Sequence, residues 1–198
     1  MTAFITRCWQ RLSVLAVLMA CLALPAQADT IASRMAEAEL VNGQLAVDTR
    51  FGIKLPPSLT EALAQGVTLT FRLEFELTRP RMAAYYLNLR DLFDPHAAIA
   101  YKIAYQTLTN RYRVTIGGLS SYYGTLAEAL AMVGAIRGWR VLEPGQLAGL
   151  GPDEVAGKVR LQLDIAELPK PFQLNALGAS DWSLSSGWVG LGIRREPS

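Results

Sequence analysis

The sequence predicts a mainly β fold of the β-rich α+β class: an antiparallel two-sheet sandwich with one or two short helices. Three observations support this. Apolar and polar residues alternate along several segments, as strands with one buried and one wet face require. Turn residues separate these segments at short intervals, and only two segments show helical spacing. Clean alternation favours antiparallel pairing, because parallel strands are usually buried on both faces.

The first 28 residues have the three parts of a cleavable secretory signal peptide. Arg7 and Arg11 form a basic start without acidic residues, and an apolar run of 13 residues follows. Ala26 and Ala28 then give a small-x-small cleavage pattern, so the mature chain is expected to begin at Asp29. The apolar run is shorter than the roughly 20 residues that a transmembrane helix needs. We therefore expect a periplasmic or secreted protein with no membrane span after cleavage.

Cys21 offers an alternative way of processing the N-terminus. Leu18-Met19-Ala20-Cys21 resembles a lipobox, in which Cys21 would become the lipidated first residue of an inner- or outer-membrane lipoprotein. An uncleaved anchor is the third reading of this segment.

Removing residues 1–28 changes the composition. The full chain has 19 Lys and Arg against 17 Asp and Glu, and the loss of Arg7 and Arg11 leaves 17 against 17. A neutral domain lacks the basic surface that binds phosphate backbones, so no nucleic-acid partner is expected. Both cysteines, Cys8 and Cys21, also lie in the removed segment, which excludes thiol chemistry and disulfides from the mature chain. Residues 29–198 suit a single domain.

Strands are expected along most of this domain. Asn42-Gly43 is typical of a tight hairpin turn between strands at residues 31–41 and 44–51. Residues 67–78 alternate apolar and polar side chains throughout, and residues 159–165 and 172–176 repeat the pattern. Large apolar residues change from odd to even positions between residues 99–105 and 108–116, which predicts a bulge or turn near residues 107–111.

Two segments are predicted to be short helices. Ser58 with Glu61, and Thr125 with Glu128, have the spacing of a capping box. The first helix should stop at Gly66. The second should stop near Gly138, with one apolar face made by Leu126, Leu130, Val133 and Ile136. Residues 142–158 contain four glycines and two prolines and are expected to form a long loop.

Four segments in order resemble one family of exported bacterial proteins, the domain-of-unknown-function family 4390. They are residues 105–114 (YQTLTNRYRV), 125–130 (TLAEAL), 161–172 (LQLDIAELPKPF) and 181–188 (DWSLSSGW). The resemblance covers roughly residues 31–190. It implies a bacterial envelope protein whose gene neighbourhood includes a sensor kinase. The family has no assigned catalytic residues that could be carried over to this chain.

Asp91, Asp94 and His96 are the candidate catalytic residues. They lie within six residues and include the single histidine of the chain, so they could form a divalent-metal site or an acid–base pair. Asp94-Pro95-His96 is also ordinary turn chemistry. No nucleophile elbow, phosphate loop or dinucleotide fingerprint is present, so neither a cofactor nor a metal is expected.

Arginines near strand ends are the candidate binding residues. Arg79 and Arg81 lie in one segment and Arg111 and Arg113, with Tyr112 between them, in another. If the two segments met, their guanidinium groups could hold an anionic head group or a partner's carboxylates. The alternative is that these cations cover the wet faces and edges of strands.

Together these features favour a non-enzymatic module that binds an envelope protein or a small envelope ligand. Two alternatives remain open. One is a hydrolase that acts on an envelope polymer through carboxylates. The other is a membrane-associated structural protein or lipoprotein.

Overall fold

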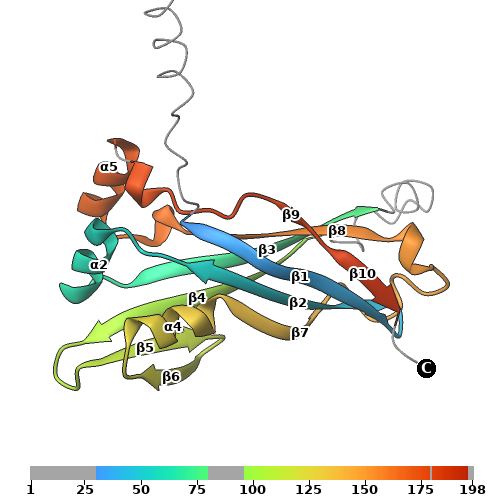
Figure 1. Cartoon of the computed structure of the whole chain (residues 1–198), viewed down its shortest axis with the longest axis horizontal. Coiled ribbons are helices and arrows are strands. Elements are labelled where there is room, and N and C mark those ends of the chain that lie inside the picture. The colour runs from blue at the N-terminus through green and yellow to red at the C-terminus, as the bar shows by residue number, and fades with distance from the viewer. Residues whose placement is uncertain (1–29, 80–95, 179, 196–198) are drawn as a thin grey trace, which may run out of the picture.

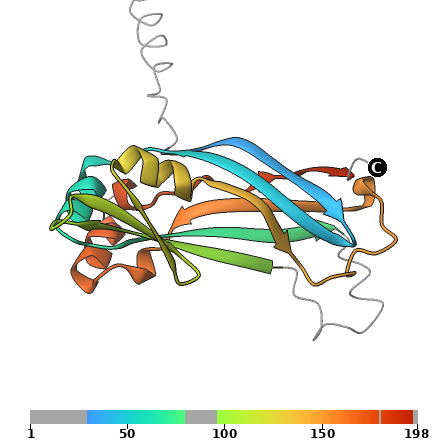
Figure 2. The same ribbon diagram turned by 90° about the horizontal axis from the view of Figure 1, so that it is seen from below.

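Two packed β-sheets form the protein (Figure 1), as a computed structural model of residues 30–79, 96–178 and 180–195 shows. One sheet has four strands in the order β10-β1-β2-β7, and the other has six in the order β6-β5-β4-β3-β8-β9. The view in Figure 2 shows them as two layers. The predicted two-sheet sandwich is confirmed. Its antiparallel pattern has one exception, because β1 pairs with β10 in parallel.

The elements follow one another closely along the chain. The strands are β1 (Ile31–Val41), β2 (Gln44–Ile53), β3 (Leu69–Arg79), β4 (His96–Gln106), β5 (Arg111–Ile116), β6 (Leu119–Tyr123), β7 (Ala135–Val141), β8 (Ala156–Leu163), β9 (Val189–Gly190) and β10 (Gly192–Arg195). The α-helices are α2 (Pro57–Ala64), α4 (Leu126–Val133) and α5 (Lys170–Gly178), and short 3-10 helices occupy Pro152–Glu154, Ile165–Glu167 and Ser180–Trp182.

The β1–β2 hairpin confirms the turn predicted at Asn42-Gly43. Both turn residues have positive φ, 49° and 71°, which a tight hairpin requires and which asparagine and glycine tolerate best. The loop after β7 docks on this turn, because the backbone N–H of Leu147 donates to the Gly43 carbonyl. The expected loop at residues 142–158 is thus tied to the hairpin through buried Leu147, and it ends where β8 begins at Ala156.

The alternation in β3 sorts its side chains between the two faces of the six-stranded sheet. Odd-numbered residues from Leu69 to Leu77 point into the sandwich and are buried, Phe71 and Phe75 completely. Even-numbered residues point outward, although Thr70 is also covered. On β4, burial of Tyr101 in the same core raises the pKa of its hydroxyl to about 12, because the phenolate would lose its hydration there.

The register change predicted near residues 107–111 is a turn between β4 and β5. The next turn, Gly117-Gly118, returns the chain as β6, and both glycines have positive φ. β6 is the edge strand of the six-stranded sheet.

One predicted strand is wrong. Residues 172–176 belong to helix α5, which begins just after Pro169. Leu174, one of the alternating apolar residues, is 71% exposed, whereas Phe172 and Ala176, four residues apart, pack against the core. Helical spacing therefore sets which side chains are buried. The Phe172 ring packs on Trp182 with their centroids 5.6 Å apart.

The two predicted helices form, but only one of the two predicted capping boxes does. Thr125 and Glu128 make the predicted capping box at the start of α4. In α2 the cap prediction is wrong, because Pro56 and Pro57 move the start before Ser58 and no side chain caps the helix. Helix α4 also ends at Gly134 rather than near Gly138.

Gly134 is the C-cap of α4, and no side chain fits at this position. A Cβ there would lie 2.2 Å from the carbonyl oxygen of Phe51, whose own N–H donates to the Gly134 carbonyl at 2.7 Å. The close approach lets β7 begin at Ala135 beside β2, so Ile136 lies in a strand instead of on the helix.

Replacing Gly134 by alanine should therefore destabilise the domain. We expect Gly134→Ala to lower the free energy of unfolding by about 1–3 kcal/mol, the usual cost of an overpacked site. Urea denaturation followed by circular dichroism measures this. Gly190→Ala is the control, because a Cβ at Gly190 would meet no atom within 4 Å. Equal stability losses in the two variants would show that the close contact between Gly134 and Phe51 does not exclude a side chain at position 134.

Candidate functional site

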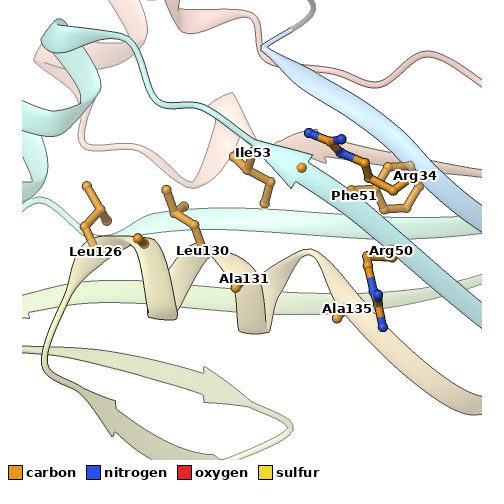
Figure 3. Close-up of a pocket in the computed structure, with 10 residues that line it drawn as sticks. Arg34, Arg50, Phe51, Ile53, Leu126, Leu130, Ala131 and Ala135 are labelled. Carbon is orange, nitrogen blue, oxygen red and sulfur yellow. The ribbon is translucent and has the colours of Figure 1, made fainter.

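A pocket of about 670 Å³ opens between α4 and the ends of β1 and β2 (Figure 3). The helix provides one wall and β2 provides the other. In Figure 3 the side chains of Ile53, Leu126 and Leu130 lie together between these walls, while Arg34 and Arg50 lie on either side of β2. The lining residues are Arg34, Arg50, Phe51, Gly52, Ile53, Leu126, Ala127, Leu130, Ala131 and Ala135.

Small residues and a strand irregularity create this space. Ala127 and Ala131, four residues apart on α4, face the pocket with only a methyl group each. On β1 the register shifts between Ser33 and Met35, so Arg34 lies at a bulge. Bulges redirect side chains. The Arg34 side chain crosses over Gly52, where its Nε lies 3.2 Å from the position that a Cβ would take.

The pocket combines an apolar wall with two exposed cations. Within the described residues, neither Arg34 nor Arg50 has a side-chain hydrogen bond or an ion pair. A guanidinium has five N–H donors and stays protonated at any physiological pH. The pocket therefore suits a ligand with an apolar body and a negatively charged group.

The predicted arginine cluster does not form among the described residues. Arg79 lies beyond the Glu76–His96 pair at one end of the sheet, whereas Arg113 pairs with Ala104 near the other. Eight residues of β4 separate His96 from Ala104, which corresponds to roughly 27 Å. Because β4 runs antiparallel to both β3 and β5, the end of β3 and the start of β5 lie at opposite ends of the sheet. Arg81 lies outside the described residues.

Arg111 and Arg113 share the outer face of β5, whereas Tyr112 points the other way. The Tyr112 ring packs on Tyr105, with ring centroids 5.0 Å apart. Arg113 lines a smaller polar pocket of about 400 Å³, together with Lys102 and hydroxyl groups of β3, β5 and β6. Lys102 is 3.2 Å from Glu167. Of the predicted binding residues, the structure thus brings Arg111 and Arg113 together on one strand.

The catalytic candidates are only partly covered by the structure. His96 begins β4 opposite Glu76, and Asp91 and Asp94 lie outside the described residues. Ala26, Ala28, Asp29 and Cys21, which bear on N-terminal processing, lie outside them too. Over residues 30–79, 96–178 and 180–195, no group of three His, Cys, Asp or Glu side chains could hold a metal ion.

A ladder of ion pairs covers the outer face of β3 and β8. Glu74 accepts hydrogen bonds from Arg160, at 3.0 and 2.6 Å, and from Gln162 at 3.1 Å. Arg72 pairs with Asp164, and that hydrogen bond raises the pKa of the Arg72 guanidinium. The Trp188 ring lies 4.5 Å from both Lys158 Nζ and Arg160 Cζ. These charges satisfy one another, so this face is stabilising rather than open for a ligand.

Sequence comparison places the chain in a family. A family model described as a domain of unknown function, DUF4390, matches residues 28–191, well over half of the chain. The chain belongs to the DUF4390 family. This confirms the resemblance drawn from the four sequence segments. Searches of curated proteins and of solved structures found no significant match to the DUF4390 chain. In the part of this DUF4390 chain that the structure describes, no helix has both the length and the hydropathy to span a membrane.

The pocket arginines of the DUF4390 chain were missed by sequence reasoning. Arg34 is drawn over Gly52 by a bulge in the β1–β2 pairing, and Arg50 lines the pocket because β7 follows α4 directly. The sequence feature that could have indicated the pocket is the pair Ala127 and Ala131. These small residues lie four positions apart, each next to a leucine, Leu126 or Leu130.

The ion-pair ladder predicts a loss of stability on substitution. Glu74→Gln in this DUF4390 chain should lower the free energy of unfolding by about 1 kcal/mol, because Arg160 loses its charged partner. The loss should shrink at high salt, since the pair is partly exposed. Urea denaturation at low and high ionic strength measures both effects.

Glu39→Gln is the matched control. It removes the same charge from β1, where the Glu39 carboxylate has no side-chain partner among the described residues. It should change stability by less than about 0.5 kcal/mol. If Glu74→Gln behaved like this control, the ladder would not be a source of stability.

Proposed function

We propose that this protein is a non-enzymatic binding module of the bacterial envelope, and that its pocket between α4 and β2 binds a small amphiphilic anion. The observation that carries the proposal is the pairing of an apolar pocket with two arginines, Arg34 and Arg50, that have no described side-chain partner. The ligand would have an apolar body and a carboxylate or phosphate group.

The size and lining of the pocket support this ligand class. Small-molecule sites commonly enclose 300–1,000 Å³ and combine apolar walls with a few polar groups. At about 670 Å³ this pocket lies within that range, with walls made by Ile53, Leu126 and Leu130. The apolar wall favours burial of a hydrocarbon body, and the guanidinium groups favour a negative charge over a neutral or positive one.

The chemistry of the lining favours binding over catalysis. Arginine, phenylalanine, glycine, isoleucine, leucine and alanine supply every side chain around the pocket. None of these provides a nucleophile or a proton acceptor, because a guanidinium has only N–H donors and the other side chains carry no polar atoms. A ligand held here would meet recognition groups without a group that could attack it.

The envelope location is part of the proposal and rests on the first 28 residues. Their basic start, short apolar run and Ala-Gln-Ala ending are those of an exported protein. In the periplasm, a domain that binds an amphiphilic anion could report its level to an envelope protein, and a sensor kinase would be a suitable partner.

Binding of decanoate to the purified mature chain tests the pocket. Isothermal titration at concentrations where decanoate is monomeric should give saturable binding, whereas decanol should bind several-fold more weakly. Arg50→Gln and Arg34→Gln should each weaken decanoate binding by about 5–10-fold, the equivalent of one solvent-exposed hydrogen bond. Each substitution should weaken decanol binding less than it weakens decanoate binding.

Two further variants locate the site. Ala131→Phe places a ring in the pocket from the exposed side of α4 and should abolish binding of both ligands. Arg137→Gln removes an exposed arginine from β7 outside the pocket lining and should leave binding unchanged. Full affinity in Ala131→Phe, or equal losses in Arg50→Gln and Arg137→Gln, would show that this pocket is not the binding site.

A further inference from the structure

Four strands lie at the edges of the two described sheets, and three of them are protected against pairing with another strand. β9 has two residues. β10 ends in two arginines, one of which pairs with Glu37. β7 carries Arg137 and Arg140, and its pairing with β2 is interrupted by a register shift. Short length, charge and bulges are the usual ways in which proteins block an edge.

β6 has none of these features. Its sequence is Leu-Ser-Ser-Tyr-Tyr, without proline, lysine or arginine, and it pairs with β5 in unbroken register. Its first four residues are exposed, including Leu119 at 80% and Tyr122 at 51%. In Figure 1 it forms the lower margin of the sheet.

The register shows which backbone groups of β6 are free of β5. Ile116 and Leu119 flank the two-residue turn and form its hydrogen-bonded pair. Such pairs alternate along an antiparallel ladder, so Ser120 and Tyr122 direct their N–H and C=O groups away from β5. No backbone hydrogen bond joins these two residues to another described element.

The charge beside this edge is positive. Arg111 and Arg113 lie on the outer face of β5, and Arg113 is directly opposite Tyr122. Neither arginine has a side-chain hydrogen bond or ion pair within the described residues. The nearest acidic residue along the chain, Glu128, is engaged by the backbone N–H groups of Gly124 and Thr125.

We propose that the β6 edge binds an extended acidic segment of another protein, which adds a seventh strand to the six-stranded sheet. Main-chain hydrogen bonds to Ser120 and Tyr122 would provide the pairing, as in other cases of strand addition. A strand beside β6 lies two strand spacings, about 9.6 Å, from β5. Glutamate and arginine side chains reach across that distance, so Arg113 and Arg111 would select acidic residues on the outer face.

A synthetic peptide in which glutamate and valine alternate over about nine residues is the probe. We expect saturable binding to the mature chain by isothermal titration, and slower hydrogen exchange at the amides of Ser120 and Tyr122. A peptide with lysine in place of glutamate should bind at least about tenfold more weakly. Equal binding of the two peptides, or no binding of either, would overturn the proposal.

Two substitutions at one position separate backbone pairing from side-chain contact. Tyr122→Ala removes the exposed ring, whereas Tyr122→Pro removes the ring and the outward N–H while leaving the bonds to β5 in place. Tyr122→Pro should bind the acidic peptide about fivefold more weakly than Tyr122→Ala, the effect of one hydrogen bond. Equal affinities would exclude strand addition at this edge. Circular dichroism of both variants shows that the fold is kept.

Charge reversal tests the selectivity. Arg113→Glu should weaken binding of the acidic peptide by about tenfold and strengthen binding of the lysine peptide, whereas Arg137→Glu on β7 should do neither. Sedimentation without peptide distinguishes a second copy of this chain as the occupant. If the chain forms dimers and Tyr122→Pro disrupts them, the β6 edge pairs with a second copy of this chain instead of an acidic partner. That result would overturn the proposal.

Discussion

Strand β3 joins the two halves of the six-stranded sheet, and the sandwich depends on how its side chains divide between the two faces. It pairs with β4 on one side and β8 on the other, although these strands lie far apart in the sequence. Its inward residues, including Phe71 and Phe75, are fully buried, and its outward residue Glu74 holds Arg160. The same alternation therefore builds the core and orders the charged outer face.

The contact between Gly134 and Phe51 has a comparable role for the four-stranded sheet. It fixes the end of α4 against β2, so that β7 continues the sheet with almost no connecting loop. This geometry holds the helix beside the strand, while the small side chains of Ala127 and Ala131 leave the space between the two surfaces unfilled. The pocket is thus a consequence of one close backbone approach next to two alanines.

Local signals in the sequence were sufficient for much of the fold. The alternation of residues 67–78, the Asn42-Gly43 turn and the Thr125 capping box each depend on neighbouring residues, and each prediction was confirmed. Residues 172–176 could not be assigned in this way. Five residues with Phe172, Leu174 and Ala176 fit either period, and only packing on Trp182 selects the helix.

The candidate site was harder to predict because it depends on contacts between distant residues. Whether Arg79 meets Arg111 is decided by strand order, and the sequence contains no local record of that order. Arg34 becomes a pocket residue only through a bulge in one strand and a glycine in the next. Exposed arginines of this kind have no periodicity that would distinguish them from other surface cations.

The unequal protection of the sheet edges limits how this domain can assemble with others. Growth of a fibre through edge pairing needs two open edges on each molecule, because every added copy must offer a new edge. Among the described edge strands, only β6 is not protected by short length, by charged side chains or by a bulge. A strand added at β6 would occupy the one unprotected edge that the described part of the domain offers, so each domain can accept one added strand.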